Sequence, residues 1–252
     1  MYNLKFKKMK KILVFLSGMM LLMLMQFGYS QSKVTWFEDF DGTLPPTQPT
    51  LWGVNPVGSW VPDATYALPN KTGVTVRSYL GFVPNRTGDT SELITGTYNC
   101  VGLDYVYLRF SHICKIDSSD IARIEYSELK GTIWSAWKPI PASSYLGTAA
   151  NYNTKLGYNA ASYSDWQQSN LTAQPAGSWW KEEKFDLKNQ AGLGIVRFRF
   201  FIKHGAKAGT HASYGWLIEN FEVIAAPYVI SLPTVQLIAP LVKDTVYNTG
   251  PW

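Results

Sequence analysis

The sequence contains few of the residues on which metal sites, disulfide scaffolds and nucleic-acid interfaces depend. Its 252 residues include two cysteines and three histidines, and charged residues make up 16% of the chain. It contains no CxxC motif and no Cys/His grouping with the spacing of a zinc site. No HExxH, GxSxG, phosphate-binding or dinucleotide-binding motif is present either, so the corresponding hydrolases and nucleotide-binding enzymes are not indicated.

The excess of basic residues is confined to the N-terminus. Residues 1–30 hold five of the 23 basic residues and no acidic residue. The other 18 basic residues balance the 18 acidic residues, so the rest of the chain is formally neutral. Because a neutral chain lacks a basic surface to compensate phosphates, we expect no nucleic-acid binding.

The lysine-rich start leads into an apolar run from Ile12 to Phe27. Gly28 and Ser30 stand where small residues precede a cleavage site, which predicts a signal peptide over residues 1–30. We therefore expect a secreted or cell-surface protein with no membrane span after cleavage. An uncleaved anchor is the alternative, but the run is shorter than the roughly 20 apolar residues of a spanning helix.

Beyond residue 30, short alternating runs dominate and helical periodicity is almost absent. This pattern predicts an all-β protein, an antiparallel two-sheet jelly-roll sandwich over residues 31–226. Residues 227–252 are interpreted as a linker and the opening of an incomplete Ig-like β domain of a longer protein. Strands are expected at residues 34–41, 74–83, 103–116, 121–127, 132–138, 179–187, 194–204 and 214–224.

Both cysteines lie in the exported part of the chain. An oxidising compartment predicts a disulfide bond between Cys100 and Cys114. A pair of buried free thiols is the alternative, because Cys114 lies in an apolar strand.

Acidic residues gather on the first and last expected strands. Glu38 and Asp41 lie on the first strand and Glu219 lies on the last. The first and last strands of a jelly roll commonly run side by side, and carboxylate oxygens suit Ca²⁺. We therefore predict a structural calcium ion as cofactor at this junction. Acids that are solvated or paired with Arg and Lys are the alternative.

Residues 141–176 form a long segment rich in Ser, Ala, Asn and Tyr, and such segments are often functional or mobile. Aromatic rings among polar neighbours suit sugar rings, so we predict an extracellular glycan or a surface protein as partner. Packing at the end of the sandwich is the alternative. The predicted ligand-binding residues are Tyr145, Tyr152, Tyr158, Tyr163, Trp166 and Trp180.

Spacing also orients several other side chains. Trp134 and Trp137 are three residues apart, so a regular strand would place them on opposite faces, and the adjacent Trp179 and Trp180 would divide in the same way. A concanavalin-like glucanase needs two carboxylates close together on one strand face. The nearest candidates here are three residues apart, so a regular strand would place them on opposite faces. We therefore expect no catalytic residues and no enzyme. These two carboxylates are Glu125 and Glu128.

Three motifs carry a family resemblance: FEDFDG at 37–42, LRFSH at 108–112 and GWLIENF at 215–221. In their order and spacing the chain resembles MAM-like, cleaved-adhesin jelly-roll domains of secreted bacterial proteins, over about residues 34–226. The resemblance implies a noncatalytic module for adhesion or carbohydrate binding. It equally allows an accessory domain of a secreted protease, and a concanavalin-like glycoside hydrolase is the remaining alternative. The family commonly has Asp where this chain has Glu219.

Overall fold

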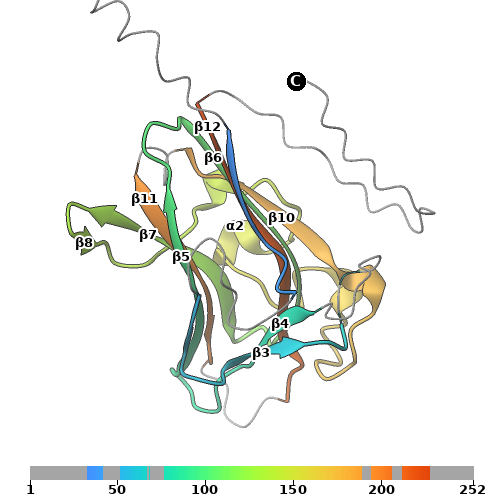
Figure 1. The fold of residues 1–252 in the computed structure, drawn as a ribbon. Helices are drawn as coiled ribbons and strands as arrows, with labels where there is room; N and C mark the ends of the chain where they lie inside the picture. Colours follow the sequence, from blue (N-terminus) through green and yellow to red (C-terminus); the bar gives the residue numbers. More distant parts are fainter. Residues whose placement is uncertain are drawn as a thin grey trace, which may run out of the picture.

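The computed structural model is an all-β sandwich, which confirms the predicted fold class. Two antiparallel sheets face each other across a continuous apolar core (Figure 1). The expected signal peptide and the expected Ig-like opening lie outside the described residues. No helix in the described part of the chain is both long and apolar enough to cross a bilayer. The structure describes residues 33–41, 52–66, 68, 77–188, 194–205 and 212–227.

The first sheet, sheet A, is organised around its longest strand, β12. One side of β12 pairs with β6, and its other side pairs with β4 and with β1, in the strand order β10-β6-β12-β4-β3. The first and last strands are therefore neighbours, as expected for a jelly roll. The strands are β1 (Val34–Glu38), β3 (Trp60–Asp63), β4 (Ser78–Gly81), β6 (Tyr105–Lys115), β10 (Lys181–Asp186) and β12 (Gly215–Ala226).

The second sheet, sheet B, is centred on β11, which pairs with β5 and β7. Its strand order is β2-β5-β11-β7-β8, and β9 also pairs with β7. In Figure 1, β8 extends beyond β7, on the side away from sheet A. The strands are β2 (Gly53–Asn55), β5 (Thr90–Asn99), β7 (Ile121–Lys130), β8 (Ile133–Trp134), β9 (Lys138–Pro139) and β11 (Ile195–Lys203).

Aromatic rings fill the space between the sheets. Alternate residues of β11 point inward, and Phe200 is completely buried at the centre of the core. Edge-to-face and stacked ring contacts of this kind stabilise the core beyond the area that they bury. The rings within contact distance of Phe200 are Trp52, Trp60, Phe110, Trp216 and Phe221.

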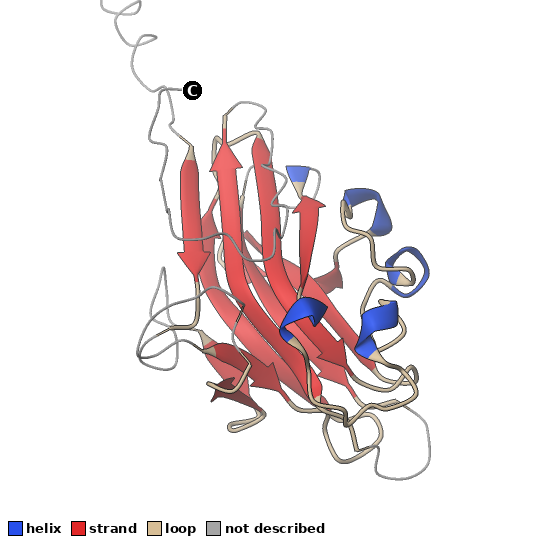
Figure 2. Ribbon diagram, turned by 90° about the vertical axis from the view of Figure 1, so that its right-hand side faces the viewer, coloured by secondary structure: helices blue, strands red, loops and turns tan. Residues whose placement is uncertain are grey.

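The segment between β9 and β10 folds against one edge of the sandwich rather than extending as a loop (Figure 2). It touches both sheets, because Tyr158 N–H donates to the carbonyl of Ala122 in β7 at 2.6 Å, and Tyr145 pairs with Phe185 of β10. It therefore covers the edge between the two sheets. Its helical turns are η1 (Ala142–Ser144), α2 (Tyr152–Lys155), η2 (Ser164–Trp166) and η3 (Gly177–Trp179).

The predicted disulfide is wrong, because both cysteines are free and buried. Cys100 lies in the turn that leads into β6, where its carbonyl accepts from Leu103 N–H. Cys114 lies near the other end of β6. Nine residues of strand between Tyr105 and Cys114 span about 30 Å, whereas a disulfide needs Cα atoms within about 7 Å of each other.

We expect the two thiols to react only after unfolding. Burial raises the pKa of Cys100 to about 12 and raises that of Cys114 well above its ordinary value, so neither forms a thiolate at neutral pH. Ellman titration should therefore detect no thiol in the native protein and two in denaturant. A melting temperature that falls on addition of reductant would contradict this result.

Candidate functional site

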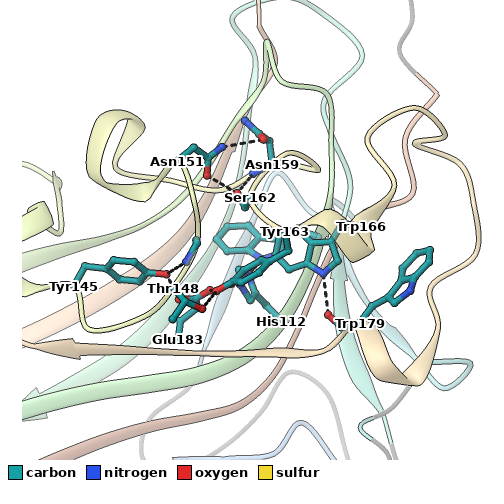
Figure 3. A network of polar contacts seen from close by, with 12 residues as sticks. His112, Tyr145, Thr148, Asn151, Asn159, Ser162, Tyr163, Trp166, Trp179 and Glu183 are labelled. Atoms are coloured by element: carbon teal, nitrogen blue, oxygen red, sulfur yellow. Dashed lines mark hydrogen bonds and ion pairs between the residues drawn. The ribbon is translucent and has the colours of Figure 1, made fainter.

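A carboxylate without exposed surface lies at the centre of a polar network beside the core. Glu183 of β10 is completely buried. The Tyr145 hydroxyl donates to its Oε2 at 2.5 Å and the Tyr163 hydroxyl donates to its Oε1 at 2.7 Å. His112 Nε2 lies 2.9 Å from the same Oε1 (Figure 3). Three donors, two from the segment between β9 and β10 and one from β6, therefore converge on one carboxylate.

His112 is held in a single neutral form. The Trp216 indole N–H donates to His112 Nδ1 at 3.0 Å. Because an indole nitrogen only donates, Nδ1 carries no proton, and Nε2 bears the hydrogen that Glu183 accepts. Burial lowers the pKa of His112, and the Glu183 carboxylate opposes this shift. The imidazole thus links the core indole to the carboxylate without a charge of its own.

We expect His112 to remain neutral where an ordinary histidine becomes protonated. Its pKa is lowered in the folded protein, whereas in the unfolded chain it lies near 6.5. As the pH falls below about 6.5, the unfolded state therefore binds the proton first, and stability decreases by up to about 1.4 kcal/mol per pH unit. Long-range ¹⁵N NMR should show the Nε2–H tautomer below pH 6. An imidazole that titrates near pH 6.5 in the folded protein would contradict the assignment.

Four of the six rings predicted to bind a ligand belong to the core, and the prediction is wrong for them. None is more than 2% exposed. Their segment lies over the edge of the sandwich, and burying such large rings there is favourable. Trp166 even uses its indole N–H within the fold, donating to the Trp179 carbonyl at 2.8 Å. The four rings are Tyr152, Tyr158, Trp166 and Trp180.

The other two predicted rings, Tyr145 and Tyr163, are half-buried, and their hydroxyls are held by Glu183. Burial and the neighbouring carboxylate raise the pKa of both phenols, so they stay protonated and remain donors. Tyr145 also stacks on Tyr152, with 4.1 Å between ring centroids. These contacts attach the segment to the sandwich.

A buried lysine holds the second half of the same segment. Lys115 of β6 has no exposed surface, and its Nζ donates to the carbonyls of Trp166 and Asn170, both at 2.8 Å. The ammonium also lies 4.8 Å from the centre of the Trp179 ring. Burial lowers the pKa of Lys115. Trp179 and Trp180 are both buried, contrary to the expected division, because η3 ends at Trp179 and β10 begins only at Lys181.

The acids predicted to bind calcium lie near the junction of β1 and β12, where Glu38 pairs with Phe221. Within the ranges that the structure describes, no group of three or more His, Cys, Asp or Glu side chains is placed to hold a metal ion. Calcium stays a prediction, tested by whether Ca²⁺ raises the melting temperature. Each carboxylate accepts a backbone N–H: Glu38 from Phe40, Asp41 from Arg77, and Glu219 from Leu68.

The carboxylates considered for a glucanase site have separate partners. Glu125 Oε2 accepts from Arg199 Nη2 at 2.5 Å. Glu128 lies 3.7 Å from Lys138 Nζ. Each carboxylate is therefore occupied by its own cation, and the two do not form a shared site.

A row of stacked aromatic and arginine side chains lies on the outer face of sheet B. The Arg197 guanidinium lies 4.2 Å from the centre of the Trp134 ring and 4.8 Å from that of Trp137. The Arg199 guanidinium lies 4.7 Å from the centre of Trp137 and 4.6 Å from that of Phe201. A guanidinium over an aromatic face is attracted electrostatically to the ring. We call these five residues the tryptophan–arginine ladder.

The ladder follows from alternation along β11. Val196 and Phe198 point inward and are completely buried, so Arg197 and Arg199 point outward. The two tryptophans share this face, contrary to the spacing argument. The reason is that β8 ends at Trp134 and β9 begins only at Lys138, so no regular strand joins the two rings. Both indoles remain partly exposed.

The sequence pattern did not identify this site. Trp134 and Trp137 were visible as a pair, but their contact with β11 depends on strand pairing across about 60 residues of chain, such as Leu129 opposite Ile195. The alternation of arginines in β11 was the signal that could have found it.

An open cleft of about 1000 Å³ lies at the end of the sandwich formed by the β2–β3 and β4–β5 turns. Phe82, which is 42% exposed, and the exposed Arg86 are among its lining residues. Thr90, which also lines the cleft, pairs with Lys203, two residues beyond Phe201. The ladder therefore runs towards the cleft.

No protein-family model matches the sequence, and no curated protein is similar to it. Among solved structures, the chain aligns with the enzymatically active domain of tailspike protein 4 from bacteriophage CBA120. The TM-score is 0.33 and the sequence identity is 13%. The match covers 79% of this chain and 20% of the tailspike chain.

The expectation that the chain is not an enzyme is contradicted by this comparison, because the tailspike structure is described as an enzymatically active domain. The exclusion of catalysis is therefore withdrawn. A likeness of this extent assigns no reaction, substrate or catalytic residue to the chain.

Proposed function

We propose that this protein is an exported carbohydrate-binding module, and that it holds polysaccharide against the tryptophan–arginine ladder. The predicted signal peptide and the resemblance to adhesin jelly-roll domains support an extracellular role. The observation that carries the proposal is the pair of partly exposed indoles, Trp134 and Trp137, on one open face. Indole faces and edges suit the CH groups of sugar rings.

The ladder also has the rigidity that a polysaccharide site needs. Contacts with Arg197 and Arg199 restrain the Trp137 ring. A side chain that is already fixed loses little conformational entropy when a ligand binds. From Arg197 to Phe201 the ladder follows β11 over about 13 Å, so it offers an extended surface suited to a polymer.

We expect Trp134→Ala and Trp137→Ala each to weaken binding of the best ligand on a glycan array about tenfold. Isothermal titration calorimetry on the purified protein measures the effect. Phe82→Ala is the matched control, because Phe82 is also an exposed ring but lines the cleft.

The outcomes separate the two surfaces. Weakened binding in the ladder variants with unchanged binding in Phe82→Ala supports the proposal. Loss of binding in Phe82→Ala alone would show that the ligand binds in the cleft and not at the ladder. A folded protein that binds no glycan on the array would overturn the proposed function.

A further inference from the structure

The arginines of the outer face of sheet B differ in how their charges are balanced. Arg199 Nη1 donates to Glu92 at 2.9 Å, and its Nη2 donates to Glu125 at 2.5 Å. Arg123 Nε lies 3.6 Å from Glu125 Oε1. Among the residues that the structure describes, no acid lies within ion-pair distance of Arg197. The uncompensated positive charge of this face is therefore at Arg197.

Arg197 also keeps hydrogen-bonding capacity. Its Nε is buried and makes no hydrogen bond to any other part of the described chain. A ligand at the surface would instead meet the two terminal nitrogens, Nη1 and Nη2, which also make no hydrogen bond within the described chain. The guanidinium lies against both indoles while the side chain as a whole stays partly exposed. A planar guanidinium held in this way is suited to bind a carboxylate through two parallel hydrogen bonds.

We propose that the ladder recognises polysaccharides that carry carboxylate groups, with Arg197 binding the sugar carboxylate and Trp134 and Trp137 packing on the sugar rings. This inference rests on the proposed function and names its ligand class. The positive charge of Arg197 and the exposed indoles together favour such a ligand, because a neutral glycan would offer hydroxyl acceptors but no negative charge to pair with Arg197. An acidic peptide would supply the carboxylate but not the sugar surface that suits the rings.

The experiment compares one polymer backbone with and without its charge. Isothermal titration calorimetry is run with polygalacturonate, with fully methyl-esterified pectin and with poly-glutamate. The protein variants are Arg197→Gln, which removes the charge, and Arg197→Lys, which keeps the charge but loses the planar fork. Arg86→Gln is the matched control, because Arg86 is an exposed arginine that lines the cleft instead. Circular dichroism confirms that each variant is folded.

We expect Arg197→Gln to weaken polygalacturonate binding about tenfold to one hundredfold, Arg197→Lys to weaken it less, and Arg86→Gln to leave it unchanged. The esterified polymer should bind more weakly than polygalacturonate and should not distinguish Arg197→Gln from the original protein. Equal binding of the two polymers, unaffected by Arg197→Gln, would overturn the carboxylate preference but keep the proposed function. Binding of poly-glutamate alone would overturn the inference in favour of a peptide, and binding of no glycan would refute the proposed function itself.

Discussion

Replacing Glu183 with leucine is expected to lower the free energy of unfolding by about 4 kcal/mol, because three donors lose their common acceptor. The hydroxyls of Tyr145 and Tyr163 and the Nε2 hydrogen of His112 all point at this carboxylate. Leucine offers no acceptor in place of the carboxylate, and the site of Glu183 is completely buried. Urea unfolding followed by tryptophan fluorescence measures the change.

A neighbouring glutamate provides the control for this substitution. Glu182 pairs with Lys184 at 2.7 Å, and both side chains are partly exposed. Glu182→Gln should therefore change stability by less than about 1 kcal/mol. If Glu183→Leu does not fold, Glu183→Gln keeps the shape and part of the acceptor capacity, and it should be cut faster than the original protein within residues 141–176. Equal stability of Glu183→Leu and Glu182→Gln would contradict the role of the network.

Replacing Lys115 with alanine is expected to destabilise the protein by about 3 kcal/mol, because two carbonyls lose the ammonium donor and a cavity is left where the stem was packed. The carbonyls belong to Trp166 and Asn170, so the damage should centre on the segment that covers the edge of the sandwich. Hydrogen exchange measured by mass spectrometry should increase over residues 166–179 before it increases in β6. Chemical denaturation gives the total loss.

One further variant separates packing from hydrogen bonding at Lys115, and a variant of another lysine is the control. Lys115→Met keeps most of the stem but not the donors, so it should recover the packing part of the loss. Lys155 also donates to a backbone carbonyl, that of Ser118 at 3.2 Å, but it does so in solvent. Lys155→Ala should therefore change stability by less than about 0.5 kcal/mol. If Lys115→Ala is as mild as Lys155→Ala, the buried ammonium does not hold the segment.

The long strands could be predicted from sequence because a half-buried strand alternates visibly. The expected strand at 103–116 corresponds to β6, and those at 194–204 and 214–224 correspond to β11 and β12. Strand β5 was missed. It contains Thr95 and Gly96 where alternation would call for larger apolar residues, and its position depends on distant contacts such as Phe198 N–H donating to Thr95 Oγ1.

The candidate sites were harder to predict than the strands, because the amino-acid composition of a segment does not show which part of the fold it packs against. The segment 141–176, which has only two charged residues, was expected to expose its rings, but Tyr158 and Trp166 pack on His112 with ring centroids 4.5 and 5.0 Å from the imidazole. The ladder was missed for the opposite reason. Its arginines and tryptophans are far apart in the chain, and only the pairing of β7 with β11 brings them together.

The pairing of β1 with β12 has a consequence for how the sandwich could be joined to other domains. Val34 lies directly opposite Ala225, so the polypeptide enters and leaves the sandwich at one corner. A short linker between these two ends should close the backbone into a ring, and new termini could then be opened in an exposed turn. The same arrangement would let the whole module be inserted into a surface loop of another protein without separating the two sides of that loop.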